Sequence, residues 1–346
     1  MISSLCTYTF AASAFMAILW VIYRSILAKV NNFKANRMVL GSIYVAGWLL
    51  PVLISSLFPT QTSTTVADDS IIIETAHEAA IHLPSILSIM WLAGVIIVAG
   101  TSAREIFLIW RLAGRSRAVE YKGRKIYLTT DKGVSPFSIG KFMVISEDDY
   151  KTAGIDMIIA HETGHMRLLH SLDVLLAQAT CVFCWYNPAV WFLRTDLKAV
   201  HEYQADRYVL SHGYAPKAYQ TFLVMKSAPA HFPMISNNFN HSQLRSRISM
   251  MNKPQWHRTA DKVRYLAPIA GIAVCCYLFN HSPLKASIQP WWHHEEEATQ
   301  QLKDTDIFID GQEVPYEQLK EVATNKIKSI TVSRNPNRID LETKDE

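Results

Sequence analysis

The chain has 346 residues, of which 49% are hydrophobic and only 18% carry a charge. This composition is unusual for a soluble domain, in which about a quarter of the residues are charged. The formal net charge of +4 is explained by the basic loops described below, and no nucleic-acid-binding motif accompanies it, so direct contact with nucleic acid is not expected.

Four apolar runs predict membrane-spanning helices, at about 5–24, 38–58, 83–103 and 265–281. Each has close to the roughly 20 residues that a helix needs to cross a bilayer. The prolines in these runs do not exclude this interpretation, because transmembrane helices tolerate proline. A buried soluble core is the competing interpretation, but four such runs are too many for a chain of this length.

The Lys and Arg residues between the runs predict the orientation of the chain. They gather at 24–37, 104–124 and 258–264, whereas the loop at 59–82 has four acidic residues and no Lys or Arg. By the positive-inside rule the basic segments are cytoplasmic, which puts both termini outside and 104–264 inside. We expect the first run to be a membrane span and not a signal peptide, because its basic residues follow the apolar stretch.

The stretch IIAHETGHMRLLH, residues 158–170, carries the main candidate for catalysis. On a helix, His161 and His165 lie four residues apart on one face and can reach the same metal ion. Glu162 can point into that site and take a proton from a water molecule. The HExxH pattern alone also occurs by chance, so an amphipathic helix with two histidines is the competing interpretation.

A catalytic zinc ion needs a third protein ligand and one open position. The residue six positions after the second histidine is Ser171, which excludes a third histidine there, and His170 is out of register. The stretch AVHEYQADRYVL supplies Glu202 instead, and Asp206 lies one turn further along the same face, where it could orient a ligand histidine. The two motifs together predict a His₂Glu site for Zn²⁺. A solvated helix face is the alternative for the two acidic residues.

The segment 110–264 is long enough for one compact domain. Strand-like stretches at 124–130 and 141–146 precede the HExxH helix. Between the two site motifs, residues 172–193 are almost as apolar as a membrane span, which predicts a pair of helices in a core or against the membrane. Two further spans are the alternative, but they would need a tight turn at Asn187. The C-x-x-C pair Cys181 and Cys184 lies in this apolar run and predicts small buried residues rather than redox or metal chemistry.

Four motifs in this order resemble the BlaR/MecR-type antirepressor membrane metallopeptidases. They are HETGHMRLLHSLDVL, WYNPAVWFL, HEYQAD and LRSRISMM, and the resemblance covers about residues 1–280. It implies a gluzincin-like zinc peptidase in a bacterial inner membrane, in which His161, His165 and Glu202 bind zinc and Glu162 is the general base. It also implies cleavage of the chain itself or of a cytoplasmic transcriptional repressor after an extracytoplasmic signal. The segment PFSIGKFMVI resembles the one that precedes the catalytic helix and could lie along an extended substrate peptide.

The C-terminal part departs from the best-known members of that family, which carry a large penicillin-binding domain after the last span. Only 66 residues follow Asn280, and the S-x-x-K match at 282–285 is attributed to chance, so β-lactam sensing is not expected. Residues 305–346 predict a strand, a turn, a short helix and two more strands. This β-α-β-β unit resembles one found beside plug domains of bacterial outer-membrane receptors, and it predicts contact with a periplasmic protein.

The predicted fold is a mainly α-helical multi-pass membrane protein with a cytoplasmic α+β zincin-like metallopeptidase domain and a small extracytoplasmic β-α-β-β tail. Its parts are three transmembrane helices in 1–109, the peptidase domain at 110–264, the fourth helix at 265–281, a linker at 282–304 and an interaction unit at 305–346.

Three functions fit these observations. A sensor-transducer peptidase is favoured by the motif order, and a housekeeping peptidase of the HtpX or CAAX-protease kind would share HExxH and E-x-x-A-D. A receptor without catalytic activity would have no need of Glu162. The candidate partners are a cytoplasmic repressor, membrane lipid, a periplasmic protein and a second copy of the chain.

Overall fold

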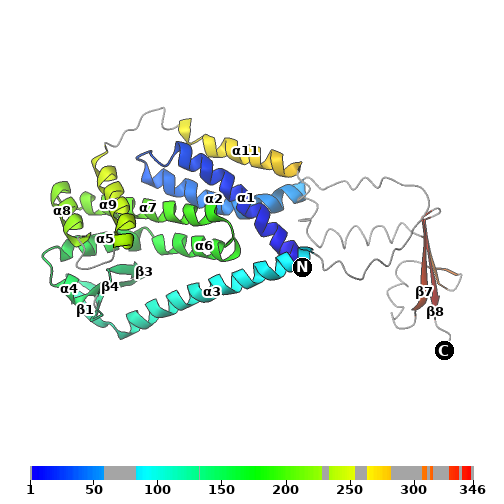
Figure 1. Ribbon diagram of the computed structural model, residues 1–346, viewed down its shortest axis with the longest axis horizontal. Helices are drawn as coiled ribbons and strands as arrows, with labels where there is room; N and C mark the ends of the chain where they lie inside the picture. The colour runs from blue at the N-terminus through cyan, green and yellow to red at the C-terminus, as the bar shows by residue number, and fades with distance from the viewer. Residues whose placement is uncertain are drawn as a thin grey trace.

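The computed structural model describes most of the chain and is mainly helical, with two small sheets (Figure 1). The described residues are 2–57, 83–131, 133–227, 234–253, 263–281, 306–309, 312–314, 327–334 and 337–343.

Three helices are long and apolar enough to cross a membrane: α1 (Ile2–Ile26), α2 (Phe33–Leu57) and α3 (Leu83–Arg115). They contain nearly all of the first three predicted spans. With 33 residues, α3 is about 50 Å long, whereas the hydrocarbon core of a bilayer is about 30 Å thick. The end of α3 that carries Arg104, Arg111 and Arg115 therefore extends beyond the apolar part of the helix.

The fourth predicted span corresponds to α11 (Ala267–Asn280), a shorter apolar helix of 14 residues. Its length is about 21 Å, less than the hydrocarbon thickness. It packs against α1 and α2. A Cβ atom on Gly271 would lie 2.5 Å from Ile22 Cδ1, so the glycine permits the close approach of α11 to α1.

The apolar stretch between the two site motifs forms a helical hairpin of α6 (His170–Phe183) and α7 (Pro188–Ser211). Asn187 caps α7 through its side-chain oxygen, which accepts a hydrogen bond from the Ala189 amide at 2.9 Å. Its amide nitrogen donates to the carbonyl oxygen of Ser13 in α1 at 3.0 Å, so the tip of the hairpin is fixed to the first helix.

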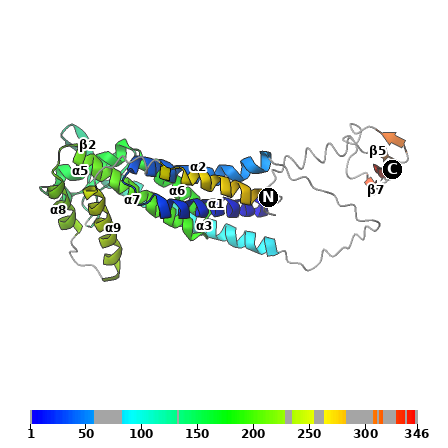
Figure 2. The same cartoon turned by 90° about the horizontal axis from the view of Figure 1, so that it is seen from above.

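This hairpin packs among the long helices as a helix pair, as the sequence predicts. Trp48 of α2 donates to Thr180 at 3.1 Å, and Gln178 donates to Ser102 of α3 at 2.6 Å. Figures 1 and 2 both show α1, α2, α3, α6 and α7 as neighbouring rods, with the remaining helices of the site and the first sheet at one end. At 14 residues, α6 is too short for a full span by itself. Together α5 (Ile155–Arg167) and α6 have the length and composition of one span, but they are bent by 62° at the break between them.

The first sheet covers one side of α5. Its strands are β1 (Arg117–Tyr121), β2 (Arg124–Thr129), β3 (Phe137–Ile139) and β4 (Phe142–Ser146), in the order β1-β2-β4-β3. Strand β2 is parallel to β4, and the other two pairs are antiparallel. The two predicted strands correspond to β2 and β4, whereas β1 and β3 are additional. The β1–β2 hairpin turns at Lys122 and Gly123, both with positive φ, as a two-residue turn between twisted strands requires.

A small apolar core joins this sheet to α5. Side chains from β2 and β4 contact three isoleucines on one face of the helix; the core consists of Ile126, Leu128, Met143, Ile145, Ile155, Ile158 and Ile159. Ser146 caps the short helix α4 (Glu147–Tyr150) by accepting from the Asp149 amide at 3.1 Å. The opposite face of α5 is left free to carry the polar site.

Two further helices, α8 (Pro216–Ser227) and α9 (Met234–Asn252), pack against each other, and α9 also packs against α7. The C-terminal sheet has the strands β5 (Asp306–Ile309), β6 (Gln312–Val314), β7 (Ile327–Arg334) and β8 (Asn337–Thr343). Its order is β6-β5-β8-β7, with β5 and β8 parallel. The three predicted strands are present and β6 is additional, whereas the predicted turn and helix lie outside the described residues.

Candidate metal centre

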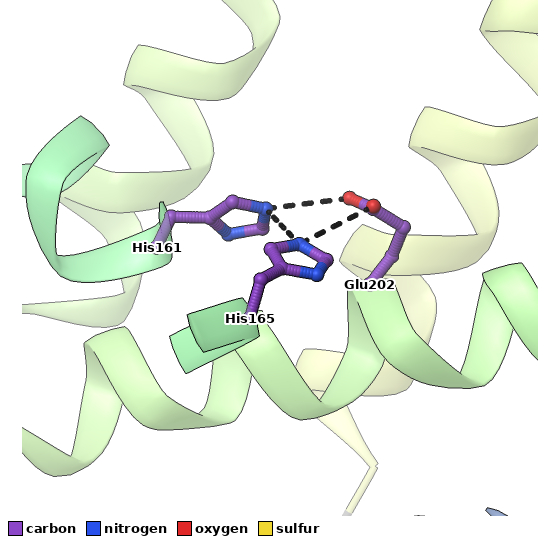
Figure 3. Close-up of side chains that lie close together, drawn as sticks. All are labelled: His161, His165 and Glu202. Carbon is purple, nitrogen blue, oxygen red and sulfur yellow. Dashed lines mark hydrogen bonds and ion pairs between the residues drawn. The ribbon is translucent and has the colours of Figure 1, made fainter. Parts of the chain in front are cut away.

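The two histidines of the HExxH motif meet the distal glutamate on a neighbouring helix. His161 and His165 come from α5 and Glu202 from α7, and their side chains converge on one point (Figure 3). The two Nε2 atoms are 3.2 Å apart, and they lie 3.4 and 3.5 Å from the carboxylate oxygens of Glu202. Among the residues that the structure describes, this is the one group of three His, Cys, Asp or Glu side chains that could hold a metal ion.

These separations test whether a metal ion fits. A tetrahedral ion with bonds of about 2.0–2.1 Å to imidazole and carboxylate holds its ligand atoms roughly 3.3 Å apart. The three observed separations agree with that value within a few tenths of an ångström. Two imidazoles and one carboxylate are also the donor set of catalytic zinc sites, which leave the fourth position open. The residues therefore fit such an ion without a large rearrangement.

Glu162 lies beside this cluster and is almost completely buried, with 7% of its surface exposed. The Ser138 hydroxyl on β3 donates to Glu162 Oε2 at 2.7 Å. Burial raises the pKa of Glu162 above its usual value, and the neighbouring His161 and Ser138 only partly oppose this shift. A carboxyl group with a raised pKa is suited to exchange protons near neutral pH.

Asp206 lies behind the first histidine, as its spacing predicts. Its Oδ1 is 3.3 Å from His161 Nδ1 and accepts a hydrogen bond from the Tyr219 hydroxyl of α8 at 2.8 Å. The Tyr219 oxygen is in turn 3.0 Å from His161 Nδ1. Since the Tyr219 proton goes to Asp206, the Tyr219 oxygen can accept the proton on Nδ1. This arrangement leaves the lone pair of His161 Nε2 directed toward Glu202 and His165.

Arg247 of α9 links the two carboxylates. It lies 3.0 Å from Glu202 Oε2 and donates from Nε to Asp206 Oδ2 at 2.9 Å. Burial would raise the pKa of Glu202, but His161 and Arg247 outweigh it and hold that pKa below its usual value. Burial alone would likewise lower the pKa of His161, yet its hydrogen bonds with Asp206 and Glu202 raise it to about 9. Without a metal ion, His161 is therefore protonated, and its Nε2 lone pair becomes available to a metal ion when that proton leaves.

The second candidate ligand, His165, is supported by residues of α6 and α7. His170 Nδ1 lies 2.9 Å from His165 Nδ1, and His170 Nε2 lies 2.9 Å from Gln204 Oε1. Gln204 itself donates to the carbonyl oxygen of Phe33, the first residue of α2, at 3.1 Å. A chain of three contacts thus joins the metal centre to a candidate membrane span.

A second connection to α2 lies next to the first. The rings of His170 and His201 are stacked with their centres 4.1 Å apart. His201 Nε2 lies 2.8 Å from Asp173, which accepts from Arg37 of α2 at 2.6 Å. The start of α2 is therefore attached to the elements of the centre both by a neutral hydrogen bond and by an ion pair.

The family comparison agrees with this structure. The sequence model of the family described as BlaR1 peptidase M56 matches residues 52–251, which is more than half of the chain. The chain belongs to the BlaR1 peptidase M56 family. It is thus an integral membrane metallopeptidase of the BlaR/MecR type, as the motif resemblance predicts. No curated protein matches the chain.

In this member of the M56 family the structure brings all five predicted site residues together. His161, His165 and Glu202 share one centre, Glu162 lies beside it and Asp206 lies behind it.

Five further residues of the site were not predicted from the sequence: Ser138, His170, Gln204, Tyr219 and Arg247. Arg247 lies within the stretch LRSRISMM that carries the family resemblance, which was the available signal for it.

The M56 centre opens into a cleft of about 570 Å³ between β3 and the helices α5, α8 and α9. In the described part of the chain, β3 pairs with β4 alone, so one side of its backbone is an unpaired sheet edge. The cleft is lined by Ser135, Pro136, Phe137, Ser138, Met157, Ile158, His161, Glu162, His165, Glu202, Tyr219, Phe222, Leu223, Lys226, Gln243 and Arg247.

Proposed function

We propose that this chain is a zinc endopeptidase that acts as a sensor-transducer. On receiving an extracytoplasmic signal, it cleaves itself, a cytoplasmic transcriptional repressor, or both. The observation that carries the catalytic part is the spacing of His161, His165 and Glu202, which matches a tetrahedral ion. Membership of the BlaR1 peptidase family supports the transducer part.

The residues of the centre have distinct roles in this mechanism. His161, His165 and Glu202 would hold the zinc ion, which acts as a Lewis acid on a peptide carbonyl group and lowers the pKa of water. Glu162 takes the proton of the attacking water and passes it to the leaving amine. Because Ser138 donates to Oε2 of Glu162, the other carboxylate oxygen is left to accept that proton. Burial of Glu162 brings its pKa closer to neutral, where such an exchange is most efficient.

The edge of β3 supports a peptide as the substrate. An extended peptide can add to an unpaired sheet edge through main-chain hydrogen bonds, with alternate side chains in flanking pockets. The cleft beside β3 contains both Ser138 and the three ligands, so a peptide held there would have a carbonyl group near the metal centre. This geometry suits an endopeptidase that accepts an internal segment of its substrate.

The peptidase faces the cytoplasm in this proposal, and α11 serves as the fourth span. The basic residues at the end of α1, the start of α2 and the end of α3 support this orientation, because they lie toward the end of the helical bundle that carries the centre (Figure 2). A cysteine introduced at Thr65 should react with an impermeant reagent in intact cells, and one introduced at Ser116 should not. Labelling at Ser116 from outside would contradict the orientation.

The C-terminal sheet would then lie outside the cytoplasmic membrane, where it contacts a periplasmic protein. A second copy of the chain is the other candidate partner, since cleavage of the chain itself can occur between two copies. The periplasmic assignment follows from the proposed orientation.

Comparison of new protein N-termini tests the function. Three strains would be compared: one with the wild-type chain, one with Glu162→Gln and one with Glu120→Gln. Glu162→Gln keeps the shape of the base, and Glu120→Gln is the control because Glu120 is exposed on β1. The proposal predicts cut sites in this chain or in a DNA-binding repressor that are absent only in Glu162→Gln. Cut sites spread over many membrane proteins would favour a housekeeping peptidase, and identical N-termini in all three would contradict peptidase activity.

A further inference from the structure

A second cavity, of about 700 Å³, lies at the start of α2. One of its lining residues is Gln204, whose Oε1 contacts His170 of the site. Three basic side chains and one acidic side chain line it, together with apolar and polar groups. The lining residues, here called the α2 pocket, are Phe33, Lys34, Arg37, Met38, Gly41, Leu168, Asp173, Gln204, Arg207, Tyr208 and Ser211.

Two of the basic groups are held in place by the protein. Arg37 donates to Asp173 at 2.6 Å, and Arg207 donates to Asn31 at 3.0 Å with its guanidinium 4.3 Å from the centre of the Phe33 ring. Within the described residues Lys34 makes no ion pair. Three positive charges therefore face one negative charge at the N-terminal end of α2, where the helix dipole also favours an anion. The α2 pocket suits a group with negative charge.

An apolar strip continues from the pocket along α2. Lys34, Met38, Gly41 and Val45 follow helical spacing and lie on one face. Met38 is 61% exposed and Val45 is 50% exposed, and a Cβ atom on Gly41 would have no neighbour within 4 Å. Because this face belongs to a candidate membrane span, the strip offers room for a hydrocarbon chain. A free phosphate ion would use the charges but leave the strip uncovered.

We propose that the α2 pocket binds an anionic phospholipid. The headgroup phosphate contacts Lys34, Arg37 and Arg207, and an acyl chain lies over Met38, Gly41 and Val45. Basic pockets between membrane helices on the cytoplasmic side are known to bind anionic headgroups, and each such Lys or Arg contributes about fivefold to the affinity. None of the three candidate metal ligands lines the α2 pocket, so its occupancy can be measured on metal-free protein.

The test counts lipids bound to the purified chain in a neutral detergent by native mass spectrometry. The probes are phosphatidylglycerol and phosphatidylcholine with identical acyl chains. We expect one tightly bound phosphatidylglycerol and weaker binding of phosphatidylcholine. Lys34→Gln should reduce the affinity for phosphatidylglycerol about fivefold. Lys29→Gln, an exposed lysine in the α1–α2 loop outside the pocket, should leave it unchanged.

A pair of glycine variants tests the acyl strip without changing any charge. Gly41→Leu should weaken the binding of phosphatidylglycerol, whereas Gly100→Leu, at an open position on α3, should not. Equal affinities for the two lipids would overturn the proposal, because the headgroup charge would not be recognised. Equal effects of the two lysine variants would overturn it in favour of a general attraction of anionic lipid to the basic protein surface. Displacement by inorganic phosphate together with no effect of Gly41→Leu would overturn it in favour of a phosphate site. Thermal unfolding midpoints of the variants show that each is folded.

Discussion

Nδ1 of His170 lies 2.9 Å from Nδ1 of His165, and this contact determines which nitrogen of His165 faces the metal centre. Gln204 donates its amide protons to the Phe33 carbonyl, so its Oε1 faces His170 and can only accept. His170 Nε2 must therefore carry the proton, which leaves His170 Nδ1 to accept one from His165 Nδ1. The lone pair of His165 Nε2 is then free to bind a metal ion.

Removal of the Gln204 acceptor, at the end of this series of hydrogen bonds, should weaken zinc binding. In Gln204→Leu, His170 is no longer held in one tautomer, and we expect zinc affinity to fall about tenfold or more. Gln204→Glu keeps an acceptor oxygen and should retain more of the affinity. Competition with a chelator measures the change, and Gln220→Leu on α8 is the control. An unchanged zinc affinity in Gln204→Leu would show that the hydrogen bonds through Gln204 and His170 do not support His165.

Zinc uptake should release a proton from His161. In the metal-free protein, burial lowers the pKa of this histidine, but Asp206 and Glu202 raise it to about 9, so it is charged at pH 7.5. Burial and the charge on His161 hold the pKa of His165 at about 4, so His165 is already neutral. Because a metal ligand must be deprotonated, apparent zinc affinity should rise with pH up to about pH 9 and then level off. Calorimetry in buffers of different ionisation enthalpy should find about one proton released per zinc at pH 7.5. Zinc binding with no proton release would contradict this assignment.

The site residues that could be predicted from the sequence are those whose relative positions are determined by helical spacing. His161 and His165 are four residues apart, as are Glu202 and Asp206, so each pair shares a helix face in any fold that keeps the helix. The apolar runs likewise predicted the long helices, because a bilayer requires a minimum number of apolar residues. The shortness of α11 was not predicted, since helix ends depend on local turns that hydropathy does not reveal.

The remaining site residues depend on tertiary packing and had no spacing that could identify them. Tyr219 reaches the centre from α8, and Ser138 reaches it from a strand of three residues. His170 follows the end of α5, where Leu169 adopts a left-handed conformation with φ of 55° and turns the chain into α6. That turn places His170 behind His165, although its position in the sequence is out of register with the motif.

Loss of the Ser138 hydroxyl should shift the pH dependence of cleavage. This hydroxyl favours the charged form of Glu162, so Ser138→Ala should raise the pKa of the base further above its usual value. A general base acts when ionised, and the acidic limb of the kcat/KM profile should therefore move to higher pH. Ser135→Ala is the control, because Ser135 lines the same cleft and the hydroxyl that donates to the Glu162 carboxylate is that of Ser138. Equal profiles for Ser138→Ala and the wild type would remove Ser138 from this role.

Arg247 should be required for both stability and metal binding. Arg247→Met would leave the buried carboxylate of Asp206 and the partly exposed carboxylate of Glu202 without their counter-charge. Breaking a buried pair such as Arg247–Asp206 typically costs about 3–5 kcal/mol. We expect a lower thermal unfolding midpoint in the metal-free protein and weaker zinc binding. Arg245→Met, an exposed arginine on the same helix, should change neither. An unaltered midpoint in Arg247→Met would mean that the two carboxylates do not depend on this cation.

The zinc content of four purified forms tests the metal centre most directly. The wild type and Glu162→Ala should each contain one zinc ion per chain by elemental mass spectrometry, because Glu162 is the base and not a ligand. His165→Ala and Glu202→Ala should contain none, since each removes one of the three side chains that converge in the structure. One zinc ion per chain in Glu202→Ala would contradict the proposed ligand set.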